Sequence, residues 1–243
     1  MSETLALVPV GNEILSGKTL DTNSNWIAAK LGAHGVVLKE IRVVPDQKDR
    51  IIEALNDLKK RYDYIITTGG IGPTHDDITA ESVAQALDRK FIWHPEAYDS
   101  LLKYYGEDNL NEGRLKMAMM PEGARLIPNA VSGAPGFSVD NIFVLAGIPE
   151  VMKSMMGHVL TYITPGRPFV SKVIKCPFPE SRIAGKLGEI QQRFQNIDIG
   201  SYPGHTNGGY PENNGYLVNV IIRGTDEASI EEAAKAIEQM FEI

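Results

Sequence analysis

The chain has 243 residues and a mass of 26.7 kDa, and 43% of them are apolar, enough for one large domain or a medium domain with a small satellite. Its formal net charge of −7 excludes a global positive field, so we expect no binding to nucleic acid or to a membrane. Cys176 is the single cysteine, which excludes an intramolecular disulfide and a multi-thiolate zinc site. The start MSETLALVPV lacks a signal-peptide pattern, and no stretch approaches the roughly 20 apolar residues of a membrane span, so we expect a cytoplasmic protein.

Residues 4 to 164 alternate short β-branched runs with segments of helical period. This alternation is typical of a parallel sheet covered by helices. Strands are expected at 5–10, 36–44, 64–68 and 142–145. Helices are expected at 21–33, after an N-cap at Asp46, around 83–87, at 95–105, at 109–119 and from Pro149.

The Pro/Gly-rich run TPGRP marks a break that divides the chain into a first domain, 1–164, and a second domain, 168–243. The second domain is expected to be a small two-layer α+β unit. Its expected elements are a strand at 169–175, a helix at 181–194, strands at 197–201 and 216–223, and a helix at 226–241. The Gly/Asn/Pro-rich stretch 202–215 predicts a long mobile hairpin loop.

The run TTGGIGPTHDDIT leaves one of the expected strands. Gly69, Gly70 and Gly72 can turn sharply there and present backbone N–H groups to an anion. The adjacent carboxylates of Asp76 and Asp77 repel each other when ionised, and a bound divalent cation would relieve that repulsion. The segment therefore indicates phosphate or diphosphate chemistry. The alternative left open is that one aspartate caps the next helix and the glycines only form a turn.

The run GNEILSGKTLDTNSN follows the first expected strand, at what should be the same edge of the sheet. Glu13, Asp21 and Asn23 can hold a cation, its water ligands or a ribose, and Lys18 can meet a phosphate. The alternative is that Asp21 caps the helix at 21–33 and Lys18 is only solvated.

A third polar loop, PNAVSGAPGF, precedes the strand at 142–145. Its Asn129, Ser132 and Gly133 can line a ligand, although turn formation alone would explain them. His75, inside the glycine/aspartate loop, can serve as a metal ligand or proton donor. The sequence lacks the serine-hydrolase elbow, the P-loop lysine motif and the HExxH zinc motif, which removes the usual support for those classes.

Three motifs in order, GNEILSGKTLDTNSNWIAAKLGAHG, TTGGIGPTHDDITAESVAQAL and PNAVSGAPGF with AGIPEVM, resemble the molybdopterin-binding-like domain family. Within it the chain is most similar to the N-terminal domain of CinA-type competence/damage-inducible proteins. The resemblance spans 4 to about 164 and implies a three-layer α/β/α fold with a mostly parallel sheet. The tail looks like the small α+β extension that follows this domain. The separate nicotinamide mononucleotide deamidase domain is not matched, so that activity is not expected.

The resemblance also assigns roles. The family's glycine loop maps to Gly69, Gly70 and Gly72, and its essential aspartate maps to Asp77, with Thr79 two residues later. By this mapping Asp77, Asp76 and Thr79 are the candidate catalytic residues. Asn12 stands where the family's more common residue is aspartate, so this chain has no carboxylate at that position.

The first functional hypothesis is a metal-dependent pyrophosphatase that hydrolyses ADP-ribose or a related dinucleotide diphosphate. Its cation, magnesium, manganese or cobalt, would be held by Asp76 and Asp77 with Glu13 or Asp21, and a monovalent cation beside it is left open. The substrate would contact the glycine loop together with Lys18, Asn23, Asn129, Ser132 and Gly133. The alternatives are a molybdopterin-binding protein or adenylyltransferase of molybdenum cofactor synthesis, and a non-catalytic nucleotide-binding module. In every case the partner is a small nucleotide or pterin phosphate, and the family implies a homodimer or homotrimer.

Overall fold

The structure is a computed structural model that describes residues 3–203 and 217–241. Two compact units divide the chain, Met1–Gly166 and Arg167–Ile243. Among the described residues, no helix is both long and apolar enough to span a membrane.

A six-stranded sheet forms the centre of the first unit, in the order β2-β1-β3-β8-β7-β6. Its strands are β1 (Thr4–Pro9), β2 (Val37–Ile41), β3 (Tyr64–Thr68), β6 (Arg125–Ile127), β7 (Gly136–Val139) and β8 (Ile142–Leu145). The pairs among β2, β1, β3 and β8 are parallel, whereas β7 runs antiparallel to both β8 and β6. The expected mostly parallel sheet is therefore confirmed, with an antiparallel part that the sequence pattern did not predict.

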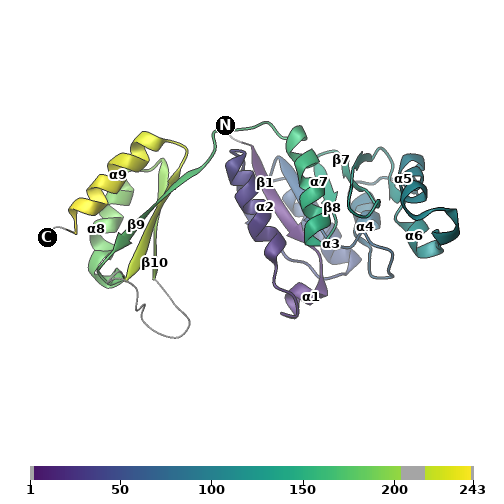
Figure 1. The fold of residues 1–243 in the computed structure, drawn as a ribbon, viewed down its shortest axis with the longest axis horizontal. Coiled ribbons are helices and arrows are strands. Elements are labelled where there is room, and N and C mark those ends of the chain that lie inside the picture. The colour runs from purple at the N-terminus through teal and green to yellow at the C-terminus, as the bar shows by residue number, and fades with distance from the viewer. Residues whose placement is uncertain (1–2, 204–216, 242–243) are drawn as a thin grey trace. The chain divides into compact units, whose positions relative to one another are not determined.

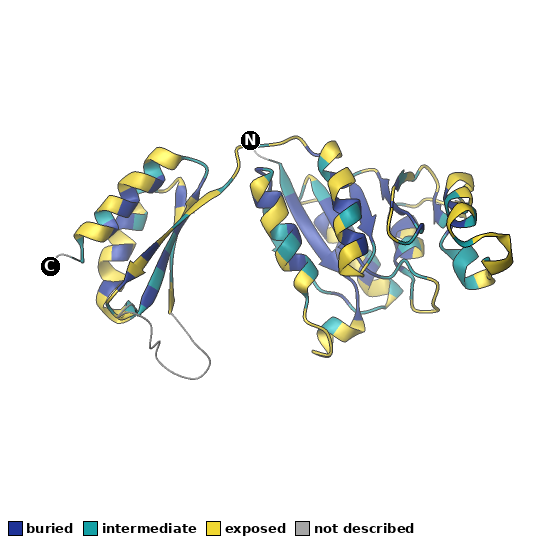
Figure 2. Cartoon of the chain, in the orientation of Figure 1, coloured by how far each residue is buried: buried dark blue, intermediate teal, exposed yellow. Residues whose placement is uncertain are grey.

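Helices cover both faces of this sheet, as Figure 1 shows. Along β1, Leu5 and Leu7 belong to one core cluster, and the alternate residues Ala6 and Val8 belong to the other. The first cluster includes apolar side chains of α2 (Thr22–Ala33) and α7 (Pro149–Tyr162); the second includes those of α3 (Lys48–Leu58) and α4 (Thr79–Ala86). The inner strands β1, β3, β7 and β8 are buried between these layers (Figure 2), so the three-layer α/β/α fold follows from the alternation of side chains along the strands.

Several short elements extend this framework. They are α1 (Asn12–Leu15), β4 (Phe91–Trp93), α5 (Pro95–Tyr105), the 3-10 helix η1 (Glu107–Asn109), α6 (Glu112–Lys116) and β5 (Met119–Pro121). The expected single helix over 109–119 is wrong. Asn111 begins the shorter α6 by accepting a hydrogen bond from the Arg114 backbone N–H at 3.0 Å, and Met119 lies in β5, which pairs with β4.

Of the aspartates expected to cap helices, one does so and the others do not. Asp21 caps α2 by accepting from the Ser24 N–H at 3.0 Å, as the structural alternative held. Asp46 is not a cap, because Gln47 occupies that position of α3 and the Asp46 carboxylate instead accepts from the Asn12 N–H at 2.8 Å. Neither Asp76 nor Asp77 caps α4, whose N-cap position is occupied by Ile78.

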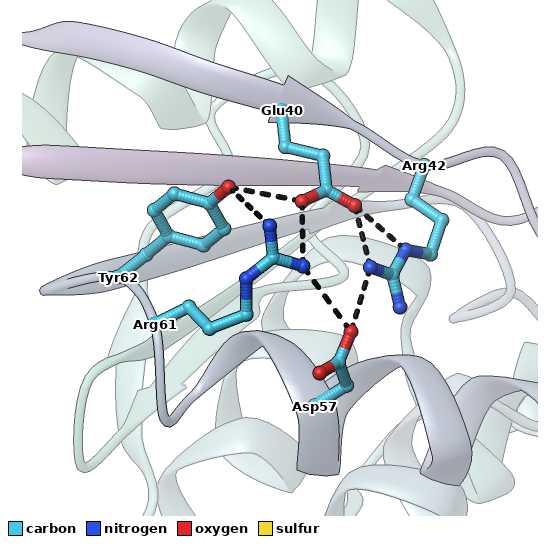
Figure 3. A network of polar contacts seen from close by, with 5 residues as sticks. All are labelled: Glu40, Arg42, Asp57, Arg61 and Tyr62. Atoms are coloured by element: carbon cyan, nitrogen blue, oxygen red, sulfur yellow. Dashed lines mark hydrogen bonds and ion pairs between the residues drawn. The ribbon is translucent and has the colours of Figure 1, made fainter.

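Five polar side chains, which we call the edge network, join the edge strand β2 to α3 (Figure 3). Arg42 lies 2.5 Å from Glu40 and 2.7 Å from Asp57, and Arg61 lies 3.1 Å and 3.4 Å from the same two carboxylates. The Tyr62 hydroxyl donates to Glu40 at 2.9 Å. Each carboxylate of the edge network is thus neutralised by arginine, and charged side chains on an edge strand also discourage pairing with another chain.

The second unit contains an antiparallel sheet in the order β10-β11-β9 with two helices. Its elements are β9 (Val170–Cys176), α8 (Glu180–Arg193), β10 (Ile197–Pro203), β11 (Val218–Gly224) and α9 (Glu227–Gln239). Alternate β11 residues, Val220 and Ile222, pack in one cluster with Ile183 of α8 and Ala233 of α9. The expected small α+β domain is confirmed. Of the expected loop at 202–215, the first two residues belong to β10 and the rest lie outside the described residues.

Candidate functional site

Loops from the strands of the six-stranded sheet meet at one of its edges. The C-terminal ends of the parallel strands β1, β2, β3 and β8 meet there, and the antiparallel β7 brings its N-terminal end to the same edge. A pocket of about 630 Å³ opens at this edge. Polar lining groups come from Glu13, Asp46, the glycine loop, Thr74, Asp76, Asp77, Arg114, Asn129 and Ser132. We call this cavity the site pocket.

The glycine loop lines the site pocket with unused backbone donors. Gly69 and Gly70 have φ angles of 96° and 69°, a left-handed conformation that favours glycine. The Gly69 N–H is occupied, since it donates to the Leu145 carbonyl at 3.0 Å. Within the described part of the chain, the N–H groups of Gly70, Ile71 and Gly72 donate to no protein acceptor. Three adjacent free amides suit an anion such as a phosphate.

Close approach also explains two of these glycines. A Cβ at Gly70 would lie 2.1 Å from the Thr79 hydroxyl oxygen, and one at Gly72 would lie 2.7 Å from an Asp77 carboxylate oxygen. Thr79 is fully buried, its N–H donates to the Gly70 carbonyl at 2.9 Å, and it is not among the residues that line the site pocket. The structure therefore places Thr79 beneath the loop, in a position to hold the loop's shape.

Asp76 and Asp77 converge on one hydroxyl. The Thr74 Oγ1 lies 2.5 Å from Asp76 Oδ1 and 2.6 Å from Asp77 Oδ2, and the Thr74 N–H also donates to Asp77 at 2.8 Å. A hydroxyl has one proton and can donate to only one of the two carboxylates at a time. The Thr74 hydroxyl lowers the pKa of Asp76 below its usual value, so that carboxylate is ionised at neutral pH. His75 is 96% exposed and 3.9 Å from Asp76, and it does not line the site pocket.

Two more carboxylates line the same cavity, those of Glu13 and Asp46. Glu13 was expected here, whereas Asp46 was interpreted only as a helix cap. The signal for Asp46 was its place directly after the β2 segment, because strand ends of a parallel sheet share one edge. Glu13, Asp46, Asp76 and Asp77, which we call the pocket carboxylates, form no ion pair with lysine or arginine within 4.0 Å in the described ranges.

The oxygen donors of the pocket carboxylates suit a hard divalent cation such as Mg²⁺. The described residues contain no group of three His, Cys, Asp or Glu close enough to form a complete protein cage. A magnesium site of the usual open kind needs only one or two carboxylates, with water and substrate phosphates as the other ligands. The pair Asp76 and Asp77 fits that kind of site.

Three of the expected ligand residues lie elsewhere. Asp21 and Asn23 line a small adjoining pocket of about 80 Å³, which shares Glu13 with the site pocket. Both oxygens of Asp21 contact Ser24, so the structure does not bring Asp21 together with Asp76 and Asp77. Lys18 is exposed and lines neither cavity.

Asn23 joins two loops of the edge. Its amide donates to the Gly147 carbonyl at 2.7 Å, while its buried Oδ1 has no hydrogen-bond partner among the described residues. Gly147 follows β8 and lines the site pocket. Asn23 therefore fixes the loop after β8.

The loop after β6 is organised by Asn129. Its amide nitrogen donates to Ser132 Oγ at 2.6 Å and to the Ala134 carbonyl at 2.8 Å, and its Oδ1 accepts two backbone N–H groups. Asn129 and Ser132 line the site pocket. Gly133 does not; it has a φ of 70°, and a Cβ there would lie 2.3 Å from Tyr104. Asn129 thus shapes the wall that carries the Ser132 hydroxyl.

The sequence interpretation missed one wall of the site pocket. Tyr105 of α5 and Arg114 of α6 line it, and the Arg114 guanidinium carbon lies 4.2 Å from the centroid of the Tyr105 ring. No sequence motif links two residues on separate short helices, so only the tertiary structure reveals this pair.

Comparison with known proteins assigns each of the two units to a protein family. Residues 6–166 match the family described as "Probable molybdopterin binding domain", and residues 168–243 match the family described as "FAD synthase, middle domain". A protein from Archaeoglobus fulgidus is 33% identical over 235 residues, covering 97% of this chain and 96% of the relative. A protein from Pyrococcus abyssi is 35% identical over 252 residues, covering 96% and 94%.

Among solved structures, a CinA protein of unknown function from Thermoplasma acidophilum is 33% identical, with a TM-score of 0.63. The match covers 66% of this chain and 98% of that one. In this chain, residues 168–243 match the middle domain of FAD synthase, which refines the expected CinA-type extension. With its glycine loop and pocket at the carboxyl edge of a mostly parallel sheet, the chain belongs to the molybdopterin-binding domain family, in its CinA-like form.

Proposed function

We propose that this protein is a metal-dependent pyrophosphatase that hydrolyses ADP-ribose or a related dinucleotide diphosphate such as FAD. The observation that carries this proposal is the composition of the site pocket, where residues with unbonded backbone amides line the same cavity as four carboxylates that form no ion pair with lysine or arginine within 4.0 Å in the described residues. The amides suit a phosphate and the carboxylates suit a cation, and a diphosphate-cation complex combines the two. The match of the second unit to a domain of FAD synthase agrees with a dinucleotide ligand.

The reaction adds water to one phosphorus and breaks the bond to the bridging oxygen. From ADP-ribose it yields AMP and ribose 5-phosphate. The N–H groups of Gly70, Ile71 and Gly72 would stabilise charge that develops on the phosphoryl oxygens. An ionised pocket carboxylate would accept the proton of the attacking water. When bound by Asp76 and Asp77, a divalent cation would supply charge compensation and a water of lowered pKa.

A second function is favoured by one observation, the family description of residues 6–166, which names molybdopterin. Molybdopterin also carries a phosphate, so the same amides would bind it, and the chemistry would be binding or adenylyl transfer.

Product analysis distinguishes these functions. Purified protein is incubated with ADP-ribose, FAD, NAD and nicotinamide mononucleotide, with magnesium, manganese or cobalt, and with a chelator. We expect AMP to be released from ADP-ribose or FAD only in the presence of metal. If the folded protein leaves every dinucleotide intact but binds and adenylylates molybdopterin with ATP, the pyrophosphatase proposal is wrong and the second function holds. Nucleotide binding without turnover under any metal would indicate a non-catalytic module.

A further inference from the structure

Arg114 differs in charge from the rest of the site pocket. Among the described residues that line this cavity, it is the one with a cationic side chain, whereas four carboxylates line it as well. The carboxylates come from segments that follow β1, β2 and β3, whereas Arg114 comes from α6, in the segment between α5 and β5. An anionic ligand repelled by the carboxylates therefore has one fixed positive group available in the wall.

The guanidinium of Arg114 is held in place before any ligand binds. It stacks over Tyr105 at 4.2 Å, and its Nη1 donates to the Asn109 carbonyl at 2.5 Å. Its side chain forms no ion pair in the described residues, and the residue is half-buried. A guanidinium has five N–H donors in a planar fork that matches two phosphate oxygens, and one such contact leaves the rest available. A side chain already fixed loses little conformational entropy on binding.

We propose that Arg114 binds the second phosphate of a diphosphate ligand and so makes the site pocket selective for nucleoside diphosphates over nucleoside monophosphates. This inference rests on the proposed function, in which the glycine-loop amides bind the other phosphate. A monophosphate would occupy the amides alone and would gain little from Arg114. A diphosphate would gain a charge-assisted, bidentate contact.

Calorimetric titration tests the assignment without turnover. The two probes are AMP and the α,β-methylene analogue of ADP, whose bridge cannot be hydrolysed, both with magnesium. The variants are Arg114→Gln, which removes the charge, and Arg114→Lys, which keeps the charge but loses the fork. The matched control is Arg182→Gln, because Arg182 stacks on Phe178 at 4.0 Å in the second unit, outside the site pocket.

We expect the unmodified protein to bind the methylene diphosphate more tightly than AMP. Arg114→Gln should weaken binding of the diphosphate by about 10- to 100-fold, the range of a hydrogen bond between charged groups, and should weaken AMP binding by less than about threefold. Arg114→Lys should fall between, and Arg182→Gln should match the unmodified protein. If Arg114→Gln weakens both probes equally, or neither, the assignment to the second phosphate is wrong although the proposed function stands. If the unmodified protein binds neither probe, both proposals are wrong.

Discussion

Two groups of carboxylates in the first unit have opposite environments. In the edge network, Glu40 and Asp57 lie between Arg42 and Arg61, at distances from 2.5 to 3.4 Å (Figure 3). The pocket carboxylates lack any such partner in the described residues, and two of them share a single hydroxyl.

The difference indicates that the edge-network carboxylates stabilise the fold, whereas the pocket carboxylates are available to bind a ligand. A carboxylate paired with arginine stabilises the fold, and because its charge is already neutralised it binds a substrate or cation weakly. The pocket carboxylates have no lysine or arginine within 4.0 Å in the described residues, so their charge is available to a bound cation. A substitution at each group should therefore affect a different property.

The largest effect is expected at Asp77. Asp77→Asn retains an oxygen that can accept from the Thr74 N–H, so the loop should fold normally, but it removes a charge from the proposed cation site. We expect turnover of ADP-ribose or FAD to fall by at least about 100-fold, with an almost unchanged melting temperature. Glu40→Gln is the matched control, with turnover retained and stability lowered. Normal turnover in Asp77→Asn would remove this residue from the catalytic site.

The next effect concerns the shape of the glycine loop. Gly70→Ala would place a methyl group 2.1 Å from the buried Thr79 hydroxyl oxygen and would force alanine into a left-handed conformation. We expect turnover to fall by about tenfold or more, because the free amides would move. Gly185→Ala is the control, since nothing lies within 4 Å of its Cβ position in α8. Equal activity of the two variants would show that the loop conformation is not needed.

A smaller effect on stability is expected from the edge network. Arg42→Gln leaves Asp57 with the more distant Arg61 contact, and Glu40 with Arg61 and the Tyr62 hydroxyl. We expect a loss of about 1–2 kcal/mol in the free energy of unfolding, measured with urea, and unchanged turnover. A loss of turnover at full stability would mean that the edge network serves the site and not the fold.

The smallest effect is a difference in pH dependence. Arg42 lowers the pKa of Asp57; burial raises the pKa of Glu40, but hydrogen bonds from Arg42 and Tyr62 outweigh burial and bring it below its ordinary value. Both folded-state pKa values are thus below the ordinary 4.5 of glutamate and 3.8 of aspartate. Their stabilisation is present above those ordinary values and is lost as the pH falls through the folded-state values.

Urea unfolding between pH 7 and pH 3 measures this dependence. The double variant Glu40→Gln/Asp57→Asn should be less stable at pH 7 and should lose stability less steeply on acidification. Parallel curves for the variant and the unmodified protein would show that the edge network does not contribute to acid sensitivity.

The amino-acid sequence by itself determined the elements with long or repeated local signals. The helix at 95–105 has the predicted bounds because burial on one face imposes a helical period, and the strands at 64–68 and 142–145 have them because burial on both faces requires a continuous apolar run. The glycine loop was also visible, since its residue types fit few other conformations. The strands β4 to β7, of three or four residues each, were missed because a short run gives a weak strand signal; β8, also of four residues, was recognised from its uninterrupted apolar sequence IFVL.

Only the tertiary structure decided which polar residues share the site. Asp46, which was expected to cap a helix, lines the site pocket, whereas Asp21 and Lys18 do not. Thr79 is buried beneath the glycine loop. The tertiary structure also brought Arg114 to Tyr105 and the pocket wall. The physical reason is that local sequence fixes backbone preferences over a few residues, whereas contacts between distant segments depend on strand order, which periodicity does not encode.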